Sequence, residues 1–285
     1  MDAQTFFKKL DNISDIPTLP SIVLTVNNML QDYDTTIKNL SNVIEKDQAM
    51  VTKILRLVNS TFYGFRSSIK NISHAVIVLG FNTIRNAVVS VSIIKTFSGK
   101  DICEGFEIEE FWKHSIAVAV TSRYLAEQTK LDSPEDCFVS GLLHDIGKLV
   151  LSQYFTGLFS EVWKSVEKDN LSFYEAEKKL LPVNHAQIGG YLTKKWQFPL
   201  ALVDSITYHH KIRLAVLNPD QLIVVHTADS IVNARTDDSK GIVGFPPLDP
   251  EAKKIMSHQV ETVSDWFPDV ATEIESACDF FLNQE

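Results

Sequence analysis

The sequence has little cysteine and few of the residues that turn a chain. Its three cysteines, Cys103, Cys137 and Cys278, lie far apart and form no Cys-x-x-Cys pair. This odd, scattered set excludes a disulfide framework and favours a reducing compartment. Glycine (11) and proline (10) together make up roughly 7% of the residues, against a typical sum of about 12%. The shortage of turn residues favours helices over a many-turned β-sandwich.

Long apolar runs and a basic excess are also missing. The longest stretch without a charged residue, residues 16–31, is shorter than the roughly 18 residues that a membrane span requires. The first residues are acidic where a signal peptide has a basic start, so we expect a cytoplasmic protein with no membrane partner. A net charge of -9 argues against general affinity for nucleic acid. The charge is uneven, with +4 on residues 1–100 and -13 on residues 101–285.

Apolar periodicity predicts an all-α protein with an N-terminal helical bundle over residues 1–100. Apolar stripes with a helical period, starting after Pro20, Thr35 or Thr36, and Asp47, predict the first helices, and Ser73 is expected to cap a short one over residues 75–79. A longer helix is predicted after Gly80. The expected boundary of this bundle is Ser98 to Asp101, where the periodicity lapses and the composition turns acidic.

Residues 101–285 are predicted to form a second helical domain that packs on the first. A helix is expected over 109–129, and another over 135–151 begins after Ser133 and Pro134. Further helices are predicted at 158–168, 172–180, 184–195, 199–209 and 220–234. Residues 241–250 are rich in glycine and proline and are expected to form an exposed loop before one or two closing helices.

Six of the eight histidines lie between residues 114 and 226, and several have an acidic neighbour. Helices of one bundle can project such side chains to a common point, which is how helical proteins assemble metal sites. His144 and Asp145 are adjacent, so on one helix they differ by about 100° in direction and can flank one ion. Imidazole and carboxylate ligands suit a divalent transition metal, and a carboxylate can bridge two ions. Lys148, one turn beyond Asp145, can meet a phosphate oxygen.

The run from Gly141 to Lys148, Gly-Leu-Leu-His-Asp-Ile-Gly-Lys, resembles the HD superfamily of metal-dependent phosphohydrolases. The resemblance implies one or two divalent ions (Fe, Mn, Ni or Zn). Its basic ligand positions are filled by His114, His144, Asp145 and Asp229. The additional histidines of the two-metal members are matched by His185 and by His209 or His210.

The whole chain resembles more narrowly the bacterial HDOD family of signal-transduction output domains. The marks of that family extend in order from residue 13 to about 235: Leu19-Pro20, the run from Leu55 to Ser60 with Tyr63-Gly64, the run from Ala75 to Gly80, the His-Asp pair, and Trp196 to Pro199 leading to His209-His210. Many HDOD proteins have lost metal ligands, whereas this sequence keeps a full set. No Gly-Tyr-Pro motif follows His210, so we do not expect hydrolysis of cyclic di-GMP.

The resemblance implies a bacterial signalling protein that acts as a regulatory or interaction module with a divalent metal site. Its partner would be a signalling protein or a small phosphorylated ligand. The alternative is a metal-dependent phosphohydrolase acting on a phosphoester or nucleotide. In that case the catalytic residues are Asp145, which orients the attacking water, and Lys148, which contacts phosphate.

Other features favour structural roles. Residues 40–57 have the spacing of a helix-turn-helix, but few exposed polar side chains besides Thr52, Lys53 and Arg56 are expected there, which disfavours DNA binding. Asn59 is expected to cap a turn through bonds to the backbone. His226, on the same helix face as Asp229, is expected to lie outside the ligand set. His74 and His258 are expected at the surface.

Overall fold

Helices are the predominant elements of the computed structural model, and they confirm the all-α prediction. The structure describes residues 1–13, 19–31, 34–59, 68–97, 103, 105–212, 217–237, 241–244 and 246–282. The first helices are α1 (Ala3–Asp11), α2 (Ser21–Gln31), α3 (Ile37–Ile44), α4 (Gln48–Val58), α5 (Ile72–Leu79) and α6 (Phe81–Phe97). The expected boundary at Ser98 to Asp101 lies outside the described residues.

The second half of the chain continues the helical pattern and adds one short hairpin. The elements are α7 (Ile108–Thr129), α8 (Pro134–Leu143), α9 (Ile146–Tyr154), α10 (Thr156–Asp169), α11 (Phe173–Leu180), α12 (His185–Lys195), α13 (Leu200–Tyr208), α14 (Pro219–Val232), β1 (Arg235–Asp237), β2 (Gly241–Gly244), α15 (Pro250–Ile255), α16 (Ser257–Glu261) and α17 (Val263–Leu282). The expectation that residues 241–250 form only a loop is wrong. Residues 241–244 pair antiparallel with β1, because the β-branched Ile242 and Val243 favour a strand.

Capping side chains fix where the helices of the first half begin. The sequence left Thr35 and Thr36 open as the start of α3, and it is Thr36 that accepts a hydrogen bond from the backbone N–H of Asn39, at 3.2 Å. Helix α4 starts after Asp47 as predicted, and Asp47 accepts a hydrogen bond from the backbone N–H of Met50 at 3.0 Å. The expectation that Ser73 caps α5 is wrong. Asn71 caps this helix instead, accepting from His74 N–H at 2.8 Å, so the helix begins earlier, at Ile72.

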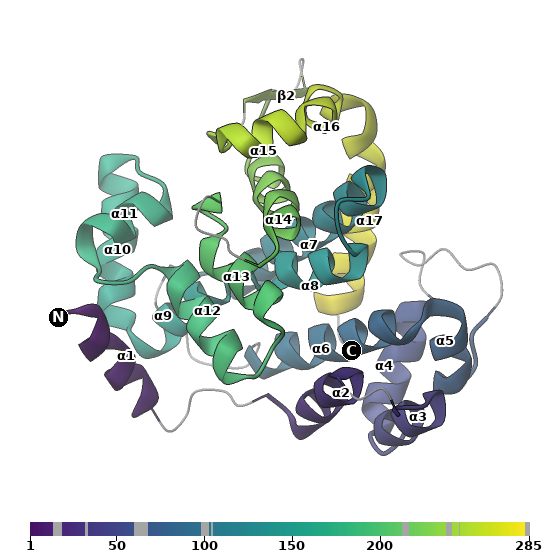
Figure 1. Cartoon of the computed structure of the whole chain (residues 1–285). Coiled ribbons are helices and arrows are strands. Elements are labelled where there is room, and N and C mark those ends of the chain that lie inside the picture. The colour runs from purple at the N-terminus through teal and green to yellow at the C-terminus, as the bar shows by residue number, and fades with distance from the viewer. Residues whose placement is uncertain are drawn as a thin grey trace.

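Helix α6 joins the two halves of the molecule. It is buried along almost its whole length, and α2, α4 and α5 pack on one side while α8 packs on another. Figure 1 shows it running between the helices of the first half and α7 and α8. Arg85 of α6 forms an ion pair with Asp136 of α8 at 2.6 Å. The buried core is therefore continuous between the halves.

Helix α1, which the sequence patterns did not predict, lies against the second half. Phe6 stacks on Phe155 with ring centroids 4.5 Å apart, and Phe7 stacks on Tyr191 at 4.6 Å. The hydroxyl of Tyr191 donates to Asp11 at 2.6 Å. In Figure 1, α1 accordingly lies beside α9 and α12, away from α2 to α5.

The prediction of one helix over residues 135–151 is wrong. The helix is interrupted at His144 and Asp145, the two central residues of the predicted metal site. Helix α8 ends at Leu143 and α9 begins at Ile146, so His144 and Asp145 form the junction. Gly147, just after it, lies so close to α12 that a Cβ there would overlap the carbonyl oxygen of His185. The backbone of α9 therefore packs directly against the start of α12. At the break, the side chains of His144 and Asp145 lie close together, with Nε2 of His144 3.4 Å from Oδ2 of Asp145.

The described helices do not have the properties of a membrane span. No single one of them is both long and apolar enough to cross a membrane. Helices α5 and α6 are long and apolar enough only when taken together, and the chain bends by 120° at the break between them.

Candidate metal centre

The seven candidate ligands predicted from the sequence meet in one cluster at the centre of the second half. Four of the helices that bring them together, α7, α8, α13 and α14, pack against one another, as Figure 1 shows. The candidate ligands are His114 on α7, His144 and Asp145 between α8 and α9, His185 at the start of α12, His209 and His210 after α13, and Asp229 on α14.

One group of ligand atoms surrounds Oδ2 of Asp145. His144 Nε2 lies 3.4 Å from this oxygen and His114 Nε2 lies 3.7 Å from it. Oδ1 of Asp229 completes the group, 3.2 Å from His114 Nε2 and 3.5 Å from His144 Nε2. The ligand atoms of His114, His144 and Asp229 lie within 4.8 Å of one another, a spacing at which all three can contact one ion.

The other oxygen of Asp145 faces a second group, which is made of histidines. His185 Nε2 lies 3.0 Å from Oδ1 and His209 Nε2 lies 3.8 Å from it. His185 Nε2 is also 3.3 Å from His209 Nε2 and 3.0 Å from His210 Nε2. Asp145 therefore lies between two ligand groups with one oxygen toward each, the position of a bridging carboxylate.

Backbone carbonyls orient two of the imidazole rings. His144 Nδ1 is 2.7 Å from the carbonyl oxygen of Gly141, and His209 Nδ1 is 2.7 Å from that of Ile206. A ring whose Nδ1–H donates to a carbonyl presents a lone pair at Nε2 when neutral. His144 Nε2 is fully buried and has no hydrogen-bond partner among the described residues. A buried nitrogen of this kind fits a metal ligand.

Burial and neighbouring charges shift the pKa values of His144 and His209 in opposite directions. Burial alone would lower the pKa of His144, but the carboxylates of Asp145 and Asp229 raise it to about 10. Burial lowers the pKa of His209 to about 3, and the positive charges of His144 and His185 add to this effect. The pKa of Asp145 lies well below its usual range, because His144, Lys148 and His185 outweigh the effect of burial. Without a cation, protons on histidines neutralise the buried carboxylates.

Glu177 contacts the candidate site, and the sequence patterns did not identify it. It is fully buried, and its Oε2 lies 2.5 Å from Nδ1 of His185. The pKa of His185 is raised because Glu177 and Asp145 outweigh burial. A carboxylate behind a ligating histidine fixes the ring and increases its basicity. The sequence does contain one indication of this burial. Phe173, Ala176 and Glu177 have the spacing i, i+3, i+4, which places Glu177 on the apolar face of α11.

The remaining histidines lie outside the cluster, as expected. His226 uses both ring nitrogens, with Nδ1 2.8 Å from the carbonyl oxygen of His209 and Nε2 accepting from Asp249 N–H at 3.1 Å. It therefore supports the backbone behind His209. His74 and His258 are exposed.

A cavity of about 350 Å³ opens beside the first ligand group. His114, Asp145 and Lys148 face it, and its walls include the aromatic side chains of Phe106, Phe111, Trp163 and Phe173. Lys148 Nζ lies 2.5 Å from Oδ2 of Asp145 and 5.3 Å from the centre of the Phe173 ring. The only cation that lines this cavity among the described residues is thus held next to the candidate bridging carboxylate.

The donor set fits divalent transition metals. Five imidazoles and two carboxylates offer nitrogen and oxygen ligands, the combination typical of iron, manganese, nickel and zinc sites. The low pKa values of Asp145 and Asp229 keep both carboxylates ionised at neutral pH. The buried Nε2 of His144, which has no hydrogen-bond partner among the described residues, and the carboxylate behind His185 are further features of such sites.

The chain is similar to known proteins in sequence and in fold. A model of the HDOD domain family matches residues 16–212. A curated relative, an uncharacterised protein of Treponema pallidum (strain Nichols), is 27% identical over 203 residues, which are 71% of this chain and 39% of the relative. The chain thus spans less than half the length of that protein.

Two solved structures share the fold over nearly the whole chain. An HDOD domain protein of unknown function from Geobacter sulfurreducens has a TM-score of 0.79 at 26% identity, covering 96% of both chains. A protein from Shewanella amazonensis SB2B, named as a candidate phosphohydrolase, has a TM-score of 0.74 at 22% identity, covering 95% of this chain and 97% of that one.

Proposed function

This chain belongs to the HDOD family, and from that premise we propose that it is a bacterial signalling protein whose two-metal centre hydrolyses a phosphoester. One observation carries the proposal. Asp145 lies between two complete ligand groups, with Oδ2 near His144 and Oδ1 near His185 at 3.4 and 3.0 Å. A structural metal site needs one closed set of ligands, whereas a bridging carboxylate serves a pair of ions that act together on one substrate.

One ion would be held by His114, His144 and Asp229. The other would be held by His185, His209 and His210, and Asp145 would contact both ions. Ions bound there would supply Lewis acidity for a phosphoryl oxygen and would lower the pKa of water at the site. Glu177 keeps His185 oriented toward Asp145. His226 holds the backbone carbonyl of His209 in place.

Lys148 and the adjacent cavity account for substrate binding in this proposal. The pKa of Lys148 is raised, because its attraction to Asp145 outweighs burial, so it remains a cation that can contact a phosphate oxygen. The aromatic walls of the cavity suit the organic part of a small phosphorylated ligand. We place the protein in the cytoplasm, in keeping with its three free cysteines.

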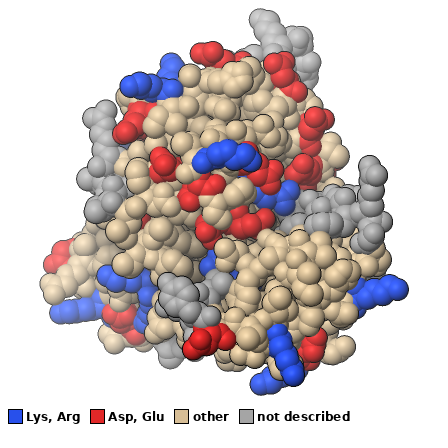
Figure 2. Space-filling view, turned by 45° about the vertical axis from the view of Figure 1, so that its right-hand side comes forward, with Lys and Arg blue, Asp and Glu red and all other residues tan. Residues whose placement is uncertain are grey.

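A regulatory module that binds a signalling protein is the second candidate. One observation favours it: large apolar side chains are exposed on the first half, namely Ile77 (68%) and Val78 (41%) on α5 and Ile37 (41%) on α3. Arg56 of α4 is exposed and Lys53 is half-buried on the same half. Figure 2 shows separate basic side chains (blue) on a mostly uncharged surface in the lower part of the view. Exposed large apolar side chains can mark a surface that binds a partner.

The test combines metal analysis with turnover. Protein purified without chelator is analysed for iron, manganese, nickel and zinc, and is then assayed with bis(p-nitrophenyl) phosphate in the presence of Mn²⁺ or Fe²⁺. We expect metal-dependent hydrolysis that is lost in Asp145→Ala. Asp204→Ala on α13 is the matched control, because Asp204 is absent from the ligand groups, and it should hydrolyse at the wild-type rate.

Each alternative outcome has a distinct meaning. Bound metal without turnover of any phosphoester, together with loss of signalling in Arg56→Ala, would favour the module over the enzyme. A protein that binds none of the four metals would contradict the metal site itself, and with it the proposed hydrolase.

A further inference from the structure

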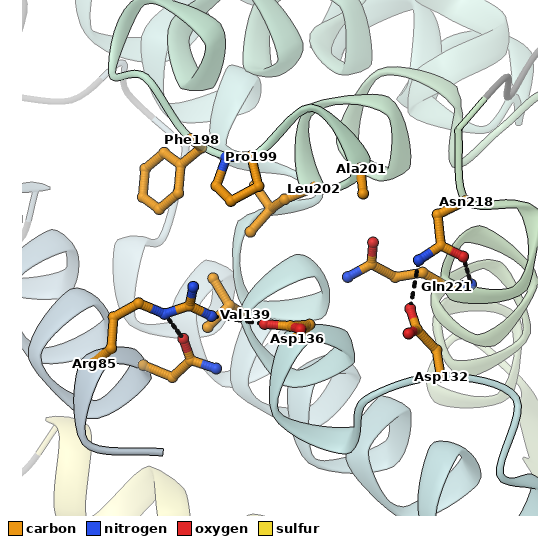
Figure 3. A pocket seen from close by; sticks show the side chains of 11 residues that line it. Arg85, Asp132, Asp136, Val139, Phe198, Pro199, Ala201, Leu202, Asn218 and Gln221 are labelled. Carbon is orange, nitrogen blue, oxygen red and sulfur yellow. Dashed lines mark hydrogen bonds and ion pairs between the residues drawn. The ribbon is translucent and has the colours of Figure 1, made fainter. Parts of the chain in front are cut away.

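A second pocket, separate from the metal centre, lies where the two halves of the chain meet. Figure 3 shows it enclosed by α6 of the first half and by α8, α13 and α14 of the second. Its volume is about 110 Å³, which is room for a small molecule rather than for a nucleotide. The side chains of Val139, Phe198 and Leu202 form an apolar wall.

The opposite wall is polar and carries a net negative charge. Asp132 and Asp136 contribute two carboxylates, and Arg85 contributes one guanidinium group. The guanidinium is already engaged, with Nη2 2.6 Å from Oδ1 of Asp136 and Nε donating to Asn86 at 2.6 Å. Asp132 accepts a hydrogen bond from Asn218 through Oδ2 at 2.8 Å. The wall therefore offers acceptors and an excess of one negative charge.

Gln221 is the feature that points to a ligand. Only 2% of this residue is exposed, and Figure 3 shows its side chain reaching from α14 into the pocket. Its Nε2 donates to the hydroxyl of Ser140 at 3.0 Å. Its Oε1 is buried and accepts no hydrogen bond from any described residue. An unsatisfied buried acceptor is costly, so a bound group that donates a hydrogen bond there is favoured.

We propose that this pocket binds a small organic cation with N–H donors, an alkylammonium or guanidinium compound. Its N–H groups donate to Gln221 Oε1 and to the carboxylates of Asp132 and Asp136, and its carbon part packs against Phe198 and Leu202. An anion would face an excess of one negative charge, and a neutral amide would leave this excess uncompensated. The proposal does not depend on metal binding or hydrolysis.

The experiment compares three probes of similar size by ligand-observed NMR and by titration of backbone amide signals. Methylguanidinium is the cation, N-methylurea has the same shape without the charge, and acetate is the anion. For a ligand of this size we expect methylguanidinium to bind with a Kd on the order of 1 mM. N-methylurea should bind at least about tenfold more weakly, and acetate should not bind.

Variants locate the binding site. Gln221→Met removes the acceptor at nearly constant volume, and Asp132→Asn removes one charge, so both should weaken methylguanidinium binding by about tenfold. Asp204→Asn on α13 makes the same charge change outside the pocket and should bind as the wild type does. Equal binding of methylguanidinium and N-methylurea, binding of acetate, no binding of any probe, or wild-type affinity in Gln221→Met would overturn the proposal.

Discussion

Glu177 and His185 are joined by two buried hydrogen bonds. Oε1 of Glu177 accepts from the backbone N–H of His185 at 2.8 Å, and its Oε2 pairs with Nδ1 of the ring at 2.5 Å. The first contact anchors the start of α12 and the second fixes the ring. His185 Nε2 consequently points at Asp145, 3.0 Å from Oδ1. The orientation of one ligand group thus depends on a residue outside it.

Glu177→Gln tests this dependence. The amide keeps the size of the side chain but removes the charge that makes His185 basic, so metal affinity should fall by about 10-fold to 100-fold. Affinity is measured by competition with a chelating dye. Glu175→Gln on the same helix is the control, because the capping box with Ser172 accepts glutamine as well as glutamate. Equal affinity of Glu177→Gln and the wild type would contradict the role of Glu177.

Metal binding should weaken as the pH falls. The carboxylates of Asp145 and Asp229 overcome burial and raise the pKa of His144 to about 10, so at neutral pH an ion must displace the proton from His144. The deprotonated form becomes rarer toward low pH, and for one displaced proton affinity drops by about tenfold per pH unit. His209, with a pKa lowered to about 3, contributes no proton in this range.

Titrations at pH 6.5, 7.5 and 8.5 check this prediction. Calorimetry in buffers of different ionisation enthalpy gives the number of protons released. A dissociation constant that does not change with pH would show that His144 is neutral before the ion binds.

Removal of the metal should lower the melting temperature. An ion that binds only the folded state and is present at 100 times its Kd stabilises that state by about 2.7 kcal/mol, which corresponds to roughly 5–10 °C. Differential scanning fluorimetry with and without EDTA at pH 7.5 measures the shift. Asp145→Ala should show little shift with EDTA, and an equal melting temperature of the wild type in both conditions is the result that would refute tight binding.

The sequence patterns predicted features that depend on local interactions. Helices α3 and α4 followed from apolar stripes and from the caps Thr36 and Asp47, which need only neighbouring residues. The candidate ligands, which the resemblance to the HD superfamily implies, lie close together in the structure, and their binding of metal stays a prediction. Helix α1 was missed because its apolar face is completed by Phe155 and Tyr191, which lie far away in the sequence.

The break between α8 and α9 and the role of Glu177 depend on contacts between distant segments. Apolar spacing continues through residues 135–151, so periodicity alone predicts one helix. The close approach of Gly147 to His185 becomes visible only when α9 and α12 are packed together. The spacing places Glu177 on the apolar face of α11, but a glutamate is rarely buried unless it is paired, and its partner His185 comes from another helix.

Gly147→Ala should destabilise the protein and disturb the metal centre. A Cβ at this position would overlap the carbonyl oxygen of His185 and lie 2.8 Å from the carbonyl carbon and 2.9 Å from the backbone nitrogen of Gly189. These are backbone atoms, so relief requires α9 and α12 to separate, at a cost of about 3 kcal/mol. Denaturant unfolding measures the loss, and metal affinity should fall with it.

Gly157→Ala on α10 is the matched control. A Cβ there meets no atom of the described residues within 4 Å, and alanine favours a helix over glycine by up to about 1 kcal/mol. This variant should be as stable as the wild type or slightly more stable. If Gly147→Ala behaved in the same way, the close packing of α9 on α12 would be disproved.

Asn59→Ala should release the chain segment that begins at Ile69. The side-chain amide of Asn59 forms two hydrogen bonds with the backbone of Ile69. It donates to the carbonyl of Ile69 at 2.8 Å and accepts from its N–H at 2.7 Å. It also donates to the carbonyl of Leu55 at 2.7 Å. Alanine removes all three bonds, which should cost about 1–2 kcal/mol and make the Ile69 amide exchange faster with solvent.

Hydrogen exchange of the Ile69 amide separates this role from a general loss of stability. Asn59→Asp keeps an oxygen that can accept from Ile69 N–H, so exchange there should stay slower than in Asn59→Ala, although both variants are destabilised. Thr36→Ala removes the cap of α3 at a similar cost of about 1 kcal/mol and should leave Ile69 protected. Unchanged exchange at Ile69 in Asn59→Ala would mean that the backbone of this segment is held by other contacts.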